Sequence, residues 1–255
     1  MARVRTKDLR CYIDGYDLSS YVTNIGSLNW DFGFEPIAAL SEEIKGGLPG
    51  QPTIGIEFIN GIFDSTATSG LHAVMSTVTY HHVMIPFGVA GAPAAADYVY
   101  FGKFEQFGYQ SEIGDGMVAA NMKFGMPPVD EGLSYHKPWG VLTHASGAET
   151  GASTAVGIDD YGSATTGGYM MYQIFSVIGE GTVTIKMQHA DTNENASFAD
   201  LGGCTSGTVA HGAVPAADIK ETTATTTTVN RYLRWQIALD TISSVTFALA
   251  FMRDI

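Results

Sequence analysis

The chain has 255 residues, a formal net charge of -13 and only 15% charged residues. Gly, Ser, Thr and Ala are abundant while Val, Ile, Tyr and Phe supply the bulk, so the composition suits short strands with many turns and predicts an all-β fold. An acidic body without clustered Lys and Arg lacks the surface that displaces counterions from nucleic acids, which makes the chain a poor candidate for gripping phosphates.

Basic residues gather at the N-terminus. Arg3, Arg5, Lys7 and Arg10 lie in the first ten residues, so a basic arm precedes an acidic body. The N-terminus lacks the apolar core of a signal peptide, and no stretch approaches the roughly 18 apolar residues of a membrane span. We therefore expect a protein that is made and kept in the cytoplasm and that has no membrane partner.

The first predicted elements are a hairpin and a helix. Residues 8–28 alternate bulky and polar side chains around the turn signal Asp14-Gly15, which predicts two antiparallel strands. Residues 35–50 then predict an amphipathic helix. Its signals are a proline for the first turn, three apolar residues on one face and a glycine pair for the C-cap: Pro36, Ile37, Leu40, Ile44, Gly46 and Gly47.

The rest of the first half predicts strands and one more helix. The strands are indicated by β-branched and aromatic residues between Gly, Pro, Asp and Ser turns. They span residues 53–64, 81–90, 97–113 and 117–126. Residues 69–77 predict a short helix capped by Ser69.

A domain junction is predicted where three prolines and mixed charge interrupt residues 127–138. We place the boundary near residue 135, between a first β domain over residues 1–135 and a second over residues 136–255. In the second domain, residues 169–190 predict a long hairpin turning at residues 179–181.

The C-terminal residues complete the second predicted domain. Residues 229–239 predict a strand, and residues 244–255 predict another, whose alternation of small with large side chains is typical of a half-buried strand. Several strands at this spacing suggest a sandwich or jelly roll.

Metal ligation and thiol chemistry are poorly supported. His72, His81 and His82 fall in one short region, but adjacent strand residues point to opposite faces, so His81 and His82 cannot easily share an ion. We interpret them as ordinary surface or interface histidines. Cys11 and Cys204 lie far apart without a CxxC partner, which indicates reduced thiols rather than a disulfide or a zinc site.

Catalytic signatures are also missing from the sequence. The chain has no GxSxG elbow, and an SxxK motif starting at Ser41 fails because Ile44 occupies the lysine position. The acidic pairs Glu42-Glu43 and Asp159-Asp160 are typical of a solvated surface. The glycine-rich residues 46–52 read as a rigid turn, because their prolines remove amide donors that a phosphate cradle needs. We expect no enzyme activity and no cofactor.

The run 231–235 offers two cations and two aromatic rings, so stacking on carbohydrate or nucleic acid is one interpretation. In a strand, Arg231, Leu233 and Trp235 share one face, with Tyr232 and Arg234 on the other. The favoured interpretation is therefore core aromatics flanked by salt-bridging arginines.

A family resemblance spans nearly the whole chain. Residues 15–32, 47–64, 69–76, 81–88 and 101–113 resemble the major tail, or tail tube, proteins of siphophages. In the second half, TVTIKMQHADTNENASFADLG and VNRYLRWQIALDTISSVTFALAFMRDI are similar to the C-terminal part of such proteins and to jelly-roll, galactose-binding-like domains.

The resemblance implies a tube-type β-sandwich with one flanking helix, assembled into hexameric rings that stack into a hollow tail tube in the virion. DNA would pass through the lumen without specific binding, and the partners would be the tape measure, tail terminator and distal tail proteins. The acidic body agrees with this expectation, since it would let DNA slide.

The expected inter-subunit contacts lie in the basic arm, the glycine-rich loop and residues 60–72, where edge strands would pair across subunits. They are Arg3, Arg5, Lys7, Gly47, Leu48, Pro49, Gly50, Gln51, Pro52, Phe63 and Leu71. The expected lumen acids are Glu57, Asp64, Glu105, Glu112 and Asp115, each of which can equally face the outside.

The alternative is a distal tail, baseplate or capsid decoration protein whose C-terminal module binds host glycans. Its contact residues would be Trp139, Tyr232 and Trp235. Stacking on sugars requires exposed aromatic rings on one face, whereas the alternation around Trp235 argues for burial.

Overall fold

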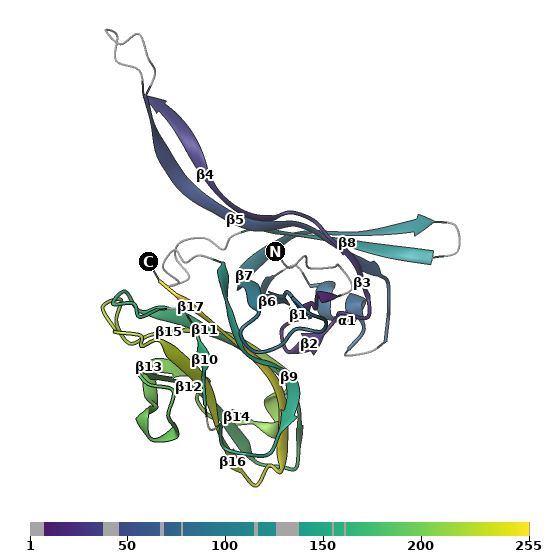
Figure 1. The fold of residues 1–255 in the computed structure, drawn as a ribbon. Helices are drawn as coiled ribbons and strands as arrows, with labels where there is room; N and C mark the ends of the chain where they lie inside the picture. Colours follow the sequence, from purple (N-terminus) through teal and green to yellow (C-terminus); the bar gives the residue numbers. More distant parts are fainter. Residues whose placement is uncertain are drawn as a thin grey trace.

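The computed structural model describes residues 8–37, 46–66, 69–77, 79–114, 117–125, 138–154, 156–160 and 162–254. Within it, only the backbone is described for residues 32–37, 46–52, 114 and 117. The predicted all-β fold is confirmed, since the chain forms strands with one short α-helix in the described part (Figure 1). Described helices include none long and apolar enough to cross a membrane.

The first half holds the α-helix and the longest strands. In chain order its elements are β1 (Tyr12–Ile13), β2 (Tyr16–Asp17), β3 (Val22–Ile25), β4 (Leu28–Ile37), β5 (Gly46–Ile62), α1 (Leu71–Met75), β6 (Tyr80–Pro86), β7 (Tyr98–Gly114) and β8 (Met117–Gly125).

The second half consists of strands with two short 3₁₀ turns, Asn195–Ser197 and His211–Ala213. Its strands are β9 (Trp139–Glu149), β10 (Ile158–Asp159), β11 (Gly168–Ile178), β12 (Thr182–Ala190), β13 (Ala199–Thr205), β14 (Val209–Ala210), β15 (Ala216–Glu221), β16 (Tyr232–Asp240) and β17 (Ser244–Arg253).

One sheet runs through both halves, in the order β15-β11-β17-β9-β7-β6-β1-β2. Its branching point is β7, which pairs with β9 through Tyr98–Tyr100 and with β8 through Glu105–Gly114. From β8 the sheet continues to β5, and β5 pairs in turn with β3 and β4. The domain boundary predicted near residue 135 lies outside the described residues, and the β7–β9 pairing joins the sheet across it.

A second, smaller sheet, β10-β16-β12-β13 with β14 beside β12, packs on the second half of the large one. Between them lies a hydrophobic core that includes Ile185 and Trp235 from the small sheet and Phe247 and Leu249 from β17. The sandwich predicted for the second half is therefore present.

Two further clusters are centred elsewhere. One fills the first half beneath α1, with Ile59, Leu71, Tyr100 and Phe104 all buried. The other joins the halves, because it combines Tyr12, Met84 and Phe101 of the first half with Leu142, Tyr169 and Ala250 of the second.

The helix predicted over residues 35–50 is wrong at both of its ends. Pro36 and Ile37 belong to β4, and Gly46 and Gly47 to β5, which pair as Pro36↔Gly47 and Ile37↔Gly46. Leu40 and Ile44 lie outside the described residues. Helical spacing of a few apolar residues is a weak preference, and pairing with a neighbouring strand overrides it.

The glycine-rich segment 46–52 is likewise a strand and not a rigid turn. Pro49 and Pro52 lie opposite Phe34 and Phe32 in the β4–β5 register. A proline lacks the N–H that a central strand must donate, but among the described strands this part of β5 pairs with β4 alone, so it lies at a sheet edge, where prolines are tolerated.

The predicted helix over residues 69–77 is confirmed as α1, although Ser69 does not cap it. The N-cap residue is Gly70, and no side chain caps it. The hairpin around Asp14-Gly15 is also confirmed: β1 and β2 pair there, and both turn residues have positive φ, 51° and 82°.

The long hairpin predicted over residues 169–190 is wrong. β11 pairs with β15 and β17 in the large sheet, whereas β12 pairs with β13, β14 and β16 in the small one. Gly179 and Gly181, both at positive φ, therefore carry the chain from one sheet to the other. Strand alternation fixes which side chains face a core, but it does not choose the partner strand.

The half-buried strand predicted at residues 244–255 is wrong for a related reason. In β17, Phe247 and Leu249 face the sandwich core, while Ala248 and Ala250 face the cluster that joins the halves. Both faces are buried because β17 lies between two layers.

Candidate assembly surface

Two long ribbons project from the body of the protein in different directions (Figure 1). In the first, β4 pairs with β5 from Leu28↔Ile56 to Ile37↔Gly46, and β5 meets β8 only from Gly55 onward. Residues 30–37 and 46–54 thus form a two-stranded ribbon. Among the described strands β4 has no partner besides β5, so its outer edge is unpaired.

The second ribbon is formed by β7 and β8. It is three-stranded at its base, where β5 pairs with Ala119 and the residues after it, and two-stranded beyond that point. Ile113, near its end, is 88% exposed, and Phe107 at its base is 62% exposed. A projecting ribbon that carries exposed apolar side chains is a candidate for contact with a partner.

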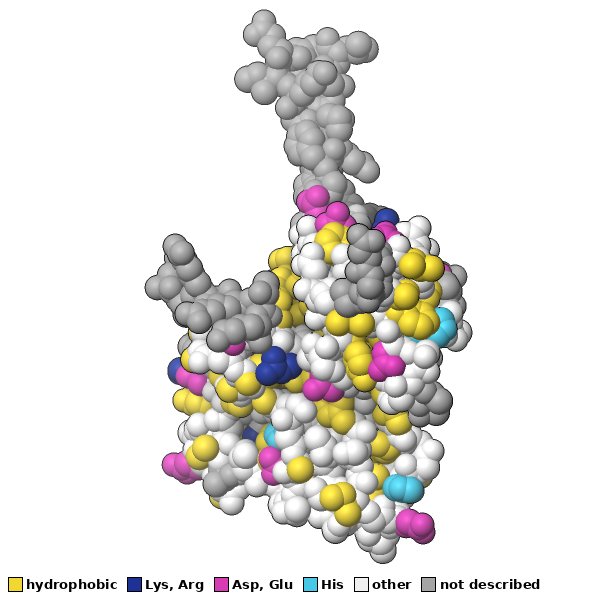
Figure 2. All heavy atoms as spheres, turned by 90° about the vertical axis from the view of Figure 1, so that its right-hand side faces the viewer, with side chains coloured by type: hydrophobic (Ala, Val, Ile, Leu, Met, Phe, Trp, Pro, Cys, Tyr) yellow, Lys and Arg dark blue, Asp and Glu magenta, His cyan; other side chains and the backbone are white. Residues whose placement is uncertain are grey.

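The face from which the β7–β8 ribbon projects carries few charges. Figure 2 shows hydrophobic side chains there among uncharged ones, with only scattered acidic and basic groups. The large apolar side chains exposed in the described part of the first half are Trp30, Ile62, Val89, Tyr98, Phe107 and Ile113.

A row of amides crosses the same sheet. Asn60 of β5 lies opposite Asn121 of β8, which lies opposite Gln110 of β7. Their neighbours Ile59 and Met122 enter the core, so the amides lie on the opposite face. The Oδ1 atoms of Asn60 and Asn121 are buried and accept no hydrogen bond from the described residues. A buried unpaired acceptor costs about 1–3 kcal/mol, so a donor from water or a partner would stabilise this face.

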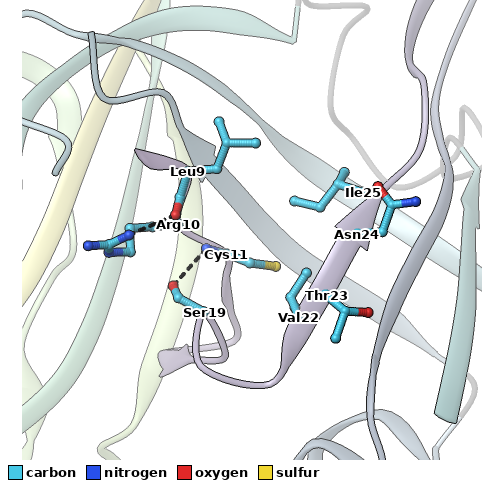
Figure 3. A pocket seen from close by; sticks show the side chains of 8 residues that line it. All are labelled: Leu9, Arg10, Cys11, Ser19, Val22, Thr23, Asn24 and Ile25. Atoms are coloured by element: carbon cyan, nitrogen blue, oxygen red, sulfur yellow. Dashed lines mark hydrogen bonds between the residues drawn. The ribbon is translucent and has the colours of Figure 1, made fainter. Parts of the chain in front are cut away.

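Two hollows border these strands. One, of about 210 Å³, lies beside the amide row and is lined by Phe107, Gly108, Gln110, Asn121 and Lys123. The other, of about 480 Å³, lies between the N-terminal segment and β3 (Figure 3). It is lined by Leu9, Arg10, Cys11, Ser19, Val22, Thr23, Asn24 and Ile25.

The larger hollow is bordered by another edge strand. Among the described strands β3 pairs with β5 alone. On the opposite side, the Cys11 amide donates to Ser19 Oγ at 2.9 Å (Figure 3). The first half thus has unpaired strand edges at β3 and at β4.

The predicted inter-subunit residues are placed unevenly. Gly47, Leu48, Pro49, Gly50, Gln51 and Pro52 lie in the β4–β5 ribbon, whereas Arg3, Arg5 and Lys7 lie outside the described residues. Phe63 is half-buried, with its ring 4.6 Å from that of His72. The prediction is wrong for Leu71. This side chain faces inward from α1 and is fully buried in the core of its own chain, so it cannot contact another subunit.

The acids predicted to line a lumen lie in different settings. Glu57, Glu105 and Glu112 are exposed strand residues, and Asp115 lies outside the described residues. Asp64 holds a turn instead: its Oδ1 accepts hydrogen bonds from the Thr66 hydroxyl at 2.7 Å and amide at 2.8 Å, which lower the pKa of Asp64. Which of these acids face a lumen stays a prediction.

The candidate glycan residues do not share an exposed face. Trp235 is buried against Phe247 and His144, as its alternation predicted. Trp139 packs on Tyr100 and Phe87 of the first half. Tyr232 is half-buried beneath the Arg231 guanidinium, which pairs with Asp159 at 2.5 Å. The structure therefore brings none of the three rings together.

Arg234 differs from the expected salt-bridging role. It is buried, donates to Gln188 Oε1 at 2.8 Å and to Asn195 Oδ1 at 2.6 Å, and lies over the Phe198 ring. Loops between the strands cover this side of β16, and sequence alternation alone does not reveal such a cover.

The thiols and histidines occupy structural positions. Cys11 and Cys204 are buried free cysteines, and burial raises the pKa of each to about 12. Within the described residues no group of three or more His, Cys, Asp or Glu side chains is placed to hold a metal ion. His81 is only 2% exposed within its own chain, so the expectation of a surface or interface histidine is wrong for it, because β6 lies between β7 and β1 in the sheet.

The chain was compared with family models, curated protein sequences and solved structures. No family model matches the chain, and no curated protein sequence matches it. Among solved structures, the chain is similar to the Dit protein of phage SPP1, which is described as a paradigm of the hub adsorption apparatus in phages that infect Gram-positive bacteria. The identity is 12% and the TM-score 0.35, over 96% of this chain and 99% of that one.

Proposed function

We propose that this chain is a non-enzymatic structural protein of a bacteriophage tail, and that its copies assemble through the projecting ribbons into rings that stack as a tail tube. The observation that carries the proposal is the pair of ribbons with exposed apolar side chains and an unpaired strand edge. A two-stranded ribbon is marginally stable by itself in water, so neighbouring subunits would complete it. The sequence resemblance to siphophage tail proteins gives the biological context.

Charge supports the conduit part of the proposal. The net charge of -13 opposes adhesion of a polyanion, so DNA would pass through such a tube without being held. The uncharged amide row and the sparsely charged face around the β7–β8 ribbon suit contact between subunits, since little charge must be desolvated there. Hexameric rings in the virion and contacts with tape measure, terminator and distal tail proteins belong to the same proposal.

The test is assembly of the purified chain, followed by negative-stain electron microscopy and light scattering over a range of concentration and salt. Hollow tubes or stacked rings are expected. Single rings that never stack would overturn the tube and favour a distal tail protein. A chain that stays monomeric at every concentration would overturn the assembly proposal, and monomers that bind a glycan array would favour the adhesin alternative.

The variant that tests the surface is Ile113→Asp combined with Phe107→Ser, which we expect to abolish tubes while leaving the monomer folded. The matched control is Ile178→Asp, since Ile178 is 65% exposed but lies in the second half, away from both ribbons. Equal loss of assembly in the control would show that the ribbons are not the contact.

A further inference from the structure

The two halves meet at the β1–β2 turn, which fits tightly against the second half. A Cβ atom on Gly15 would lie 2.5 Å from the Ala216 nitrogen and 2.8 Å from the Ile174 oxygen. The Gly15 amide donates to Gln173 Oε1 at 2.6 Å, and Gln173 Nε2 donates to the His82 carbonyl oxygen at 2.8 Å. Gln173, which is fully buried in β11, thus ties the second half to both β1–β2 and β6.

Asp14, in the same turn, is the acceptor of the first half at this joint. Its Oδ2 lies 2.5 Å from His81 Nδ1, and its Oδ1 accepts the His82 amide at 2.8 Å. His81 is held from its other side, where Nε2 lies 2.8 Å from Gln106 Oε1. His81 and Gln106 therefore fix Asp14 from within the first half.

His82 lies between two carboxylates, one from each half. Its Nδ1 is 3.6 Å from Asp14 Oδ1, and its Nε2 is 3.5 Å from Asp218 Oδ1 of β15. The side chain is 18% exposed, so these ion pairs are partly shielded from solvent. A neutral imidazole carries one N–H, whereas the imidazolium carries one on each nitrogen and has a positive charge. Only the protonated form can attract both carboxylates.

We propose that His82 is a protonation-dependent link between the two halves: as an imidazolium it joins Asp14 to Asp218, and on losing its proton it leaves two carboxylates facing a neutral ring. The joint would then loosen as pH rises. This inference does not rest on the proposed tail function.

The surrounding charges agree with this assignment. Burial opposes protonation of His82, but its ion pairs with the carboxylates of Asp14 and Asp218 outweigh burial and raise its pKa. Burial would likewise raise the pKa of Asp14, yet His81 and His82 bring it well below the ordinary value. The pKa of Asp218 is also lowered, against burial, by His82 and by Lys220.

Other charged and titratable groups near His82 have contacts of their own. Lys220 Nζ lies 2.5 Å from the second oxygen of Asp218, and Tyr172 is opposite Asp218 in the β11–β15 register. Lys103 is opposite His82 in β7, with its Nζ over the Tyr80 ring at 5.0 Å. His81 shares Asp14 with His82.

The directions of these pKa shifts determine how the stability of the joint varies with pH. A raised folded-state pKa at His82 means that its contribution is complete below the ordinary value of about 6.5 and is lost as pH rises through the folded value. The lowered pKa values of Asp14 and Asp218 mean that their contributions are complete above about 3.9. The link is therefore strongest between these limits.

The experiment measures the thermal unfolding midpoint of the full chain from pH 5.5 to 8.5, at a concentration where light scattering shows a single species. We expect the wild-type midpoint to fall with rising pH and His82→Gln to remove about 2–4 °C of that fall. His211→Gln is the matched control, since His211 is exposed and lies away from the joint. A His82→Gln chain with the full wild-type fall would overturn the proposal.

A second measurement keeps the proposal testable if His82→Gln does not fold. The NMR titration of the His82 ring in the wild type should give a pKa above its ordinary value, and Asp218→Asn should lower it. Asp191→Asn, at an exposed acid outside the joint, should leave it unchanged. A His82 pKa at or below the ordinary value, or one that ignores Asp218→Asn, would refute the link.

Discussion

The second-half sandwich and the first-half ribbons are built from the same kind of strand, but the sandwich buries its apolar side chains and the ribbons expose theirs. In the sandwich, the two sheets bury Trp235, Ile185 and Phe247 between them, and loops cover even the outer face of β16 through Arg234. The ribbons leave Ile113 and Phe107 in solvent and one edge of β4 unpaired. The sandwich buries its apolar surface within one chain, whereas the ribbons keep exposed the surface that we propose a neighbouring subunit covers.

The largest effect is expected in the sandwich core. Phe247→Ala should lower the free energy of unfolding by about 3–5 kcal/mol, because it leaves a cavity beneath Trp235 and His144. Urea unfolding followed by tryptophan fluorescence measures the loss. Ile178→Ala, at an exposed position of β11, should change it by less than about 0.5 kcal/mol. Equal losses in both variants would contradict a finished sandwich.

The joint between the regions should come next. Asp14→Asn keeps the shape of the side chain but removes the charge beside His81 and His82, at an expected cost of about 1.5–3 kcal/mol near pH 6. Because the folded-state pKa of Asp14 is lowered, wild-type stability should decline as pH falls below about 4, and its advantage over the variant should shrink.

Urea unfolding of wild type and Asp14→Asn, at pH values about one unit apart between about pH 3 and 6, measures the difference in their free energy of unfolding. Asp191→Asn serves as the exposed control. A difference between Asp14→Asn and wild type that does not vary with pH would show that the charge of Asp14 does not stabilise the joint.

A somewhat smaller loss of stability is expected from disturbing the close packing of the β1–β2 turn. Gly15→Ala should destabilise by about 1–3 kcal/mol, since Gly15 has a φ of +82° and its added methyl group would meet the backbone of Ala216. Gly151→Ala, where no atom lies within 4 Å of the new methyl group, is the matched control. Thermal unfolding compares the two, and a tolerated Gly15→Ala would mean that the halves do not press together at this turn.

The smallest effect on stability should come from the ribbons. Ile113→Ser alone should change the free energy of monomer unfolding by less than about 0.5 kcal/mol, since the side chain is 88% exposed. It should nevertheless weaken assembly, which sedimentation velocity at increasing concentration would detect. A variant that loses stability but assembles as wild type would reverse the contrast between ribbon and sandwich.

Much of the local structure could be predicted from particular residues. Asp14-Gly15 predicted its turn because a two-residue hairpin needs positive φ at both positions, and this requirement is local. The alternation around Trp235 predicted burial, and residues 69–77 predicted α1, although the structure does not use the Ser69 cap on which that prediction was based. The candidate surface was found in part, since residues 47–52 do lie in a ribbon, but Leu71 was misplaced because sequence does not show which face of a short helix meets the core.

The sequence by itself determined an all-β protein with an acidic body, because composition and two-residue alternation depend only on neighbouring residues. The tertiary structure decided which strands pair. It sent β11 and β12 to different sheets, drew residues 30–37 and 46–54 into a ribbon, and placed His82 between Asp14 and Asp218. The physical reason is that a strand pattern encodes which face is buried, whereas its partner is chosen by contacts between residues far apart in the chain.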